Sequence, residues 1–124
     1  MLPHFYRALA LSLIAALAVS CGGVRSSYNE SERRGREAML RDDLMAMRRA
    51  IDMHAADQGK LPKSLDDLIK AGYLRQIPED PITKKPDWKL IMGEDPNQPG
   101  ATGVVDIRSS STERSTEGKP YSEW

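Results

Sequence analysis

Residues 40–81 read LRDDLMAMRRAIDMHAADQGKLPKSLDDLIKAGYLRQIPEDP. Apolar side chains recur there at spacings of four, three, four and four residues, at Leu40, Leu44, Met47, Ile51 and Ala55. This spacing places them on one face of an amphipathic helix. Gly59 tolerates a positive φ, and Pro62 prevents the helix from continuing. The sequence therefore predicts a long helix over residues 32–58 that ends at Gly59.

The part of this stretch after Pro62 predicts a second, shorter helix. Ser64 is a favourable N-cap residue, and Asp66 and Asp67 fall in the first turn, where the helix dipole favours acids. The helix is expected to end at Ala71 and Gly72. Residues 77–81, IPEDP, are too rich in proline for regular structure and predict an ordered loop.

Two short strands are expected after this loop. They are residues 88–92, WKLIM, and residues 103–109, GVVDIRS. The turn-rich segment between them permits antiparallel pairing. A tryptophan at position 124, after a polar run, indicates that the end of the chain packs back on the body. The elements together predict an α+β fold in which a long helix packs on a small antiparallel sheet.

Length and composition limit the possible functions. The 124 residues suffice for one domain, and 18 basic side chains balance 18 acidic ones. Such a neutral chain lacks the basic field of a general nucleic-acid-binding protein. A single cysteine excludes an intrachain disulfide and any metal site built from several cysteines.

The amino-terminal residues have the pattern of an export signal. Residues 8–19, ALALSLIAALAV, are uncharged, follow Arg7 and precede small residues. The tetrapeptide AVSC, residues 18–21, resembles the lipobox of bacterial lipoproteins, which implies lipid attachment at Cys21. Two alternatives remain. One is an uncleaved anchor, because an apolar segment extended to Val24 is just long enough to span a bilayer. The other is that Cys21 is merely a small apolar residue at the end of a membrane segment.

These features predict three segments: a signal peptide at residues 1–20, a flexible tether at residues 21–31 and a globular domain at residues 32–124. The tether is predicted because its residues are small and polar. Arg33, Arg34 and Arg36 alternate with Glu32 and Glu37, which is typical of a solvated helix start.

No catalytic constellation is recognised in the sequence. His54 is the single histidine after the leader, the acids Asp66 and Asp67 are explained by helix capping, and no nucleophile, phosphate-loop or zinc motif is present. We expect a protein that is not an enzyme and has no cofactor and no metal. The methionines at positions 39, 45, 47 and 53 are interpreted as core or surface residues of the long helix.

The order of motifs within residues 40–81 resembles that of the major pseudopilin of bacterial type II secretion systems and its type IV pilin-like relatives. The matching residues follow the family's order: Leu44, Met47, Ala50-Ile51-Asp52, Asp57-x-Gly59-x-Leu61-Pro62, Leu65, Leu68, Gly72-Tyr73-Leu74 and Ile77-Pro78-x-Asp80-Pro81. The later GVVDIRS and the terminal Trp124 are also similar to that family. The resemblance covers about two thirds of the chain and implies a pilin-like fold, with the short helix in the loop between the long helix and the sheet.

The chain departs from this family in two respects. It lacks the family's Gly-Phe peptidase site and the glutamate near the start of the apolar helix, and a lipoprotein-like leader stands there instead. The family's carboxy-terminal loop often binds calcium, but residues 106–124 offer only four scattered acids, whereas calcium prefers six to eight oxygen ligands. No calcium site is predicted.

The resemblance implies a non-enzymatic pseudopilin-like protein of the cell envelope, exported and held by lipid on the periplasmic side of the inner or outer membrane. Its expected partners are other pseudopilins or proteins of the secretion or pilus apparatus, with no nucleic acid. The departures leave an alternative open, in which a free-standing lipoprotein uses a pilin-like domain as a binding or scaffold module.

Overall fold

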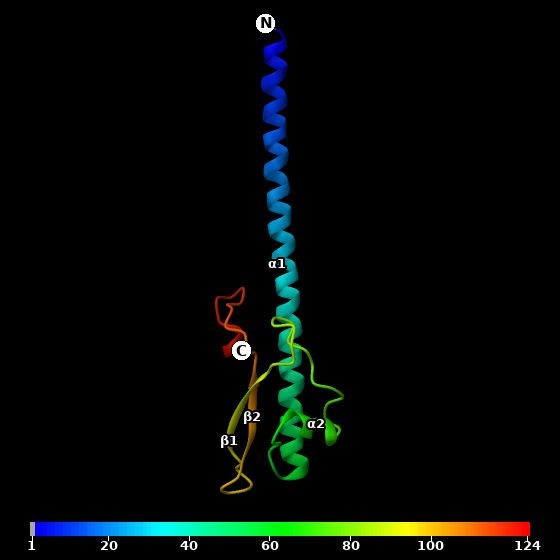
Figure 1. Cartoon of the computed structure of the whole chain (residues 1–124), viewed down its shortest axis with the longest axis vertical. Coiled ribbons are helices and arrows are strands. Elements are labelled where there is room, and N and C mark those ends of the chain that lie inside the picture. Colours follow the sequence, from blue (N-terminus) through cyan, green and yellow to red (C-terminus); the bar gives the residue numbers. More distant parts are fainter. Residues whose placement is uncertain (1) are drawn as a thin grey trace. The chain divides into compact units, whose positions relative to one another are not determined.

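The computed structural model describes the backbone of residues 2–124 and the side chains of residues 27–124. In chain order its elements are α1 (Leu2–Gln58), α2 (Leu65–Lys70), β1 (Lys89–Glu94), β2 (Thr102–Arg108) and the 3-10 helix η1 (Tyr121–Glu123) (Figure 1). The predicted α+β class, with a long helix and a small antiparallel sheet, is confirmed. Contacts divide the chain into two compact units, the first ending at Gly35 and the second being Arg36–Trp124.

The predicted apolar stripe of α1 forms much of the core of the second unit. Leu40, Leu44, Met47 and Ile51 are buried, and Ala55 packs against them. The helix ends where the sequence predicted, because Gly59 adopts a φ of 68° and its N–H donates to the carbonyl of Ala55 at 3.1 Å. Only glycine adopts this conformation without strain.

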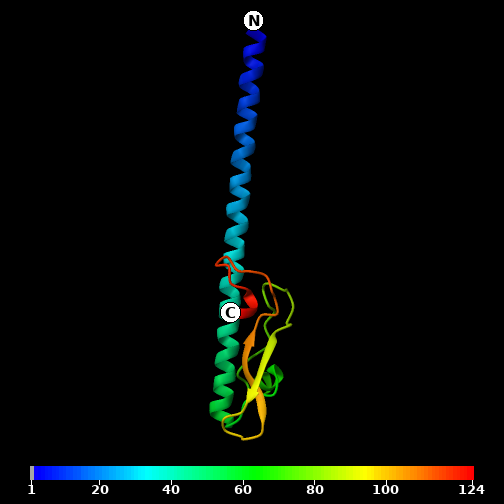
Figure 2. The same cartoon turned by 90° about the vertical axis from the view of Figure 1, so that its left-hand side faces the viewer.

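The sheet consists of β1 and β2, which pair antiparallel with a bulge between Ile91 and Met92. Val104 and Ile107 of β2 are fully buried, and both strands run alongside the second unit's part of α1 (Figure 2). Gly103 lies against the chain after α1, because a Cβ there would stand 2.5 Å from the Cβ of Leu61. This glycine lets the loop cross close to β2.

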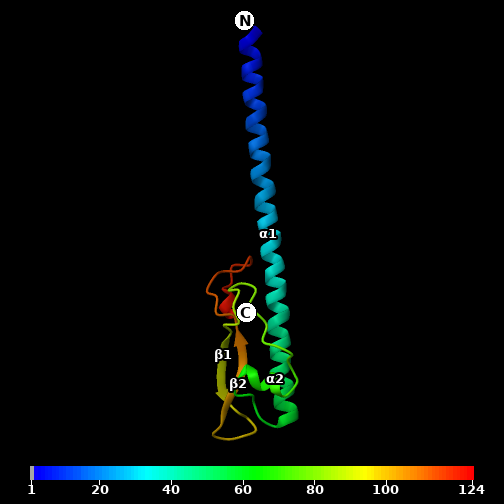
Figure 3. The ribbon, with the colours of Figure 1, turned by 45° about the vertical axis from the view of Figure 1, so that its right-hand side comes forward.

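Helix α2 buries Leu65 and Leu68 and lies beside the end of α1 that precedes it (Figure 3). Ser64 occupies the N-cap position, as predicted, in an extended conformation, and its side chain makes no capping hydrogen bond. The carboxylate of Asp67 instead accepts a hydrogen bond from the N–H of Lys63 at 2.8 Å. The side chain of Asp67, in the first turn of α2, thus binds the main chain just before the helix, whereas the Ser64 side chain does not. Gly72 ends the segment with a φ of 85°.

The proline-rich loop is ordered by one buried acid, Asp80. Its Oδ1 accepts a hydrogen bond from the N–H of Ile82 at 2.7 Å, and its Oδ2 accepts one from the Ser109 hydroxyl at 2.6 Å. Asp80 therefore closes the turn and holds the end of β2 in place. The aspartate of the IPEDP motif has a structural role.

The predicted tether needs correction over its described part, because Ser27–Ser31 lie within α1. Glu30 and Arg34 form an exposed ion pair one turn apart, at 3.1 Å. Extending an existing helix is much easier than nucleating one, and no proline stops it here. The small polar residues that predicted a flexible segment are therefore compatible with a helix.

The predicted signal peptide, residues 1–20, and the predicted lipid attachment site, Cys21, lie outside the residues whose side chains are described. Within residues 27–124, no helix has the length and apolar character needed to cross a membrane.

Candidate functional site

The carboxy-terminal strap, residues 110–124, makes several polar contacts with the described side chains of α1. It folds into a tight turn in which the N–H of Gly118 donates to the carbonyl of Ser115 and the N–H of Ser115 to that of Lys119, both at 2.9 Å. An isolated antiparallel β-bridge pairs Arg114 with Pro120, directly before η1. The strap thus has an internal structure of its own before it contacts α1.

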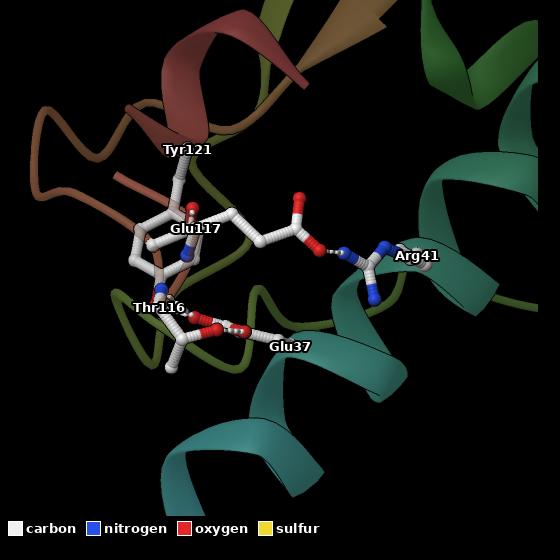
Figure 4. A network of polar contacts seen from close by, with 6 residues as sticks. Glu37, Arg41, Thr116, Glu117 and Tyr121 are labelled. Atoms are coloured by element: carbon white, nitrogen blue, oxygen red, sulfur yellow. Dashed lines mark hydrogen bonds and ion pairs between the residues drawn. The ribbon is translucent and has the colours of Figure 1, made fainter. Parts of the chain in front are cut away.

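Glu37 of α1 binds the strap through its carboxylate. Its buried carboxylate accepts hydrogen bonds from the Thr116 N–H, the Thr116 hydroxyl and the Tyr121 hydroxyl, each at 2.7 Å (Figure 4). A buried carboxylate is costly unless such donors replace water. Glu37 therefore joins the start of the globular unit to a segment about 80 residues later, and its predicted role in a solvated helix start is wrong.

Arg41, one turn further along α1, makes two contacts with the strap. Its guanidinium pairs with the Glu117 carboxylate at 3.3 Å and lies 4.4 Å from the centre of the Trp124 ring (Figure 4 shows the ion pair). The Trp124 ring packs edge-on against Tyr121, with centroids 5.2 Å apart. The predicted packing of the terminal tryptophan on the body is confirmed.

Arg48 is the third α1 residue that binds this region. Its Nε donates to Asp106 of β2 at 2.8 Å, and its Nη2 donates to the main-chain oxygens of Ile107 and Trp124, at 3.0 and 2.7 Å. Burial raises the pKa of Asp106, but the hydrogen bonds from Arg48 and from the Ile107 N–H outweigh burial and hold that pKa below its usual value. One guanidinium thus joins helix, sheet and strap.

A groove of about 330 Å³ opens between α1 and the strap. It is lined by apolar and charged side chains, namely Arg41, Leu44, Met45, Arg48, Glu117, Lys119 and Trp124. Leu44 is buried beneath it, whereas Met45 is more than half exposed. A surface that combines exposed apolar area with charges suits the binding of another molecule.

A second hollow, of about 390 Å³, lies near the end of α1. His54 borders it, but the imidazole is buried and its Nδ1 donates to the Lys60 carbonyl at 2.9 Å. The ring also packs against Tyr73, with centroids 6.0 Å apart. These contacts give His54 a structural explanation, in which it fixes the chain that leaves α1.

The hydroxyl of Ser109 and the acids Asp66 and Asp67 are explained by the fold. The Ser109 hydroxyl donates to Asp80 and is buried, and Asp66 and Asp67 lie in the first turn of α2 as predicted. Among the side chains of residues 27–124, no three histidines, cysteines or acids come together in a way that could hold a metal ion.

Among the residues of this site, sequence reasoning did not predict the burial of Glu37 or the contacts of Arg48. Glu37 lies three residues before Leu40, so it continues the apolar stripe backwards by one helical step, and this spacing could have revealed its burial. No local pattern singles out Arg48, because all its partners are 58 or more residues away.

Comparisons of the chain with protein-family models, with curated proteins and with solved structures find no match.

Proposed function

We propose that this protein is a non-enzymatic, pseudopilin-like component or accessory of a type II secretion or type IV pilus-like system. The observation that carries the proposal is that the family-like residues occupy positions on which this fold depends. Leu44, Met47 and Ile51 form the core stripe, Gly59 has a positive φ, and Asp80 is buried at a turn. A motif that matches in sequence and has such structural roles supports a pilin-like globular domain.

The architecture also supports this proposal. A long helix precedes a short helix and an antiparallel sheet, which is the element order that the resemblance implies. The long-range hydrogen bonds of Glu37, Arg48 and Asp80 are all made to other parts of the protein. Under this proposal the protein acts through its surface.

The membrane attachment belongs to the same proposal. A thiol at Cys21, directly after an apolar run and small residues, fits lipid attachment followed by cleavage before the cysteine. Two or three acyl chains are sufficient for stable anchoring, since each buried CH₂ contributes about 0.8 kcal/mol. The intact mass of protein extracted from envelopes tests this: an acylated chain that starts at Cys21 is expected, and an unmodified full-length chain would exclude it.

Co-purification tests the assignment to an apparatus. The protein, crosslinked in intact cells and purified from envelopes, is expected to bring down pseudopilins or other secretion or pilus proteins. Recovery of the bait without any such protein would argue against the proposal.

The alternative is a free-standing lipoprotein that uses the same domain as a binding or scaffold module. The absent Gly-Phe site and the absent early glutamate favour it. Neighbouring genes discriminate between the two: an adjacent secretion ATPase and membrane platform gene favour the apparatus, and isolation favours the free-standing module.

A further inference from the structure

The groove between α1 and the strap combines an apolar floor with a cationic rim. Leu44, Met45 and Trp124 supply the apolar surface. Methionine adapts to differently shaped partners, and tryptophan offers a large rigid face, so this floor suits an apolar side chain from another molecule. The rim carries three cations, Arg41, Arg48 and Lys119, against one acid, Glu117.

The three cations differ in their availability to a ligand. Arg48 is occupied by Asp106 and two main-chain oxygens and serves the fold. Lys119 is exposed, and its ammonium makes no ion pair within residues 27–124. Arg41 pairs with Glu117, but the two side chains are 49% and 71% exposed. Exposed pairs of this kind contribute little, so a carboxylate from another molecule can take the place of Glu117.

We propose that this groove binds an acidic peptide segment that also carries apolar side chains, supplied by a partner protein. The peptide's carboxylates contact Arg41 and Lys119, and an apolar side chain lies on Met45 and Trp124. Glu117 competes with the peptide, because its carboxylate forms an ion pair with the Arg41 guanidinium that the peptide's carboxylate would contact. This charge complementarity selects an acidic partner and disfavours a basic one.

The inference rests on the proposed function only in assigning the protein's action to its surface. Peptide binding is measured with purified protein, whereas secretion is measured in cells, so either proposal can fail alone.

Fluorescence anisotropy with the full-length protein in detergent tests the inference. The probe is a fluorescein-labelled hexapeptide in which glutamate alternates with leucine and phenylalanine, and the matched probe has glutamine at each glutamate position. Three variants are compared: Lys119→Gln, Glu117→Gln and, as a control, Lys89→Gln. Lys89 is an exposed lysine on β1 and does not line the groove.

The acidic peptide is expected to bind saturably, and the glutamine peptide about tenfold more weakly. Lys119→Gln should weaken binding of the acidic peptide by about threefold to tenfold. Glu117→Gln should strengthen it, because the competing carboxylate is gone, and Lys89→Gln should leave it unchanged.

Three results would overturn the inference. These are equal binding of the two peptides, weaker binding after Glu117→Gln, and self-association of the protein that Lys119→Gln abolishes. The last result would mean that a second copy of the chain occupies the groove.

Discussion

Glu37 shows how one residue can join distant parts of this chain. Its carboxylate receives the Thr116 and Tyr121 donors, so the strap depends on an acid of α1. Three short hydrogen bonds to a charged, buried acceptor belong to the stronger class of polar contact. Removing that acceptor breaks all three of these hydrogen bonds.

Glu37→Gln is therefore expected to lower the free energy of unfolding by about 1–3 kcal/mol, because an amide offers one acceptor oxygen and adds donors that face other donors. Urea unfolding measures the change. Glu32→Gln, on an exposed side chain of α1, is the matched control and should change stability by less than about 0.5 kcal/mol. Equal effects of the two substitutions would show that the network does not stabilise the fold.

Substitution of Asp43 is expected to raise stability, in contrast to substitution of Glu37. Burial, then the charges of Asp42 and Asp80, raise the pKa of Asp43 above its usual value. A carboxyl with a raised pKa binds its proton more tightly in the folded state, so its ionised form destabilises the fold at neutral pH. Asp43→Asn should raise the free energy of unfolding at about pH 7, with the gain vanishing as pH falls below the usual carboxyl pKa of 3.8. A loss of stability at neutral pH would contradict this.

Asp106 gives the reverse dependence on pH. Its pKa is lowered from the usual 3.8, so the stability it contributes is fully present above that value and is lost as pH falls through the lower folded pKa. Asp106→Asn should therefore destabilise the protein at about pH 7 and have a smaller effect at about pH 3. Unfolding curves of both proteins over this pH range provide the measurement, and a difference independent of pH would rule out the ion pair with Arg48 as its cause.

At the scale of the elements, two glycines have opposite roles. Gly103 of β2 approaches the backbone around Leu61 and Pro62, so a methyl group there must displace main chain. Gly35 lies in α1 with open space around it. Glycine within a helix lowers stability because of the conformational freedom it loses on folding.

Gly103→Ala is expected to destabilise the protein by about 1–3 kcal/mol through overpacking. Gly35→Ala should instead stabilise it by about 0.5–1 kcal/mol, because alanine favours the helix. Thermal unfolding of both variants tests the pair, and effects of the same sign would contradict the assigned roles.

The sequence predicted the elements better than the contacts between them. The stripe from Leu40 to Ala55 and the glycines at 59 and 72 are local signals, because periodicity and turn chemistry act within a few residues. The strand bounds shifted by one or two residues, and Ser64 is the N-cap residue of its helix but makes no side-chain capping hydrogen bond.

The candidate site was largely hidden in the sequence. Trp124 was expected to pack back, but its contact with Arg41 and the burial of Glu37 depend on pairs about 80 residues apart. The charged residues at positions 32–37 were all interpreted as solvated, because a sequence does not show which of them another segment will cover. Long-range polar contacts of this kind are specified by the whole fold.

At the scale of the whole molecule, the described globular unit is Arg36–Trp124, while the predicted domain starts at Glu32. A unit of this size has a small core, so polar contacts such as those of Glu37 and Arg48 carry a larger share of its stability than in a large domain. The proposed envelope function places this unit outside the cytoplasm, held by lipid at Cys21.

Cys21→Ser tests that anchoring in cells. The variant should lose its acylation and its retention with the membrane fraction, since no thiol remains for the lipid. Fractionation of envelopes and intact-mass measurement follow both effects. If the wild type and the variant both stay in the membrane fraction as full-length chains without lipid, the result would point to the uncleaved anchor instead.

The most direct test of the proposed function is protein secretion by a strain that lacks this gene. The proposal predicts that proteins exported through the secretion or pilus system accumulate inside the cell envelope, and that the wild-type gene restores their release. Normal release by the deletion strain, under conditions in which the system is active, would contradict it.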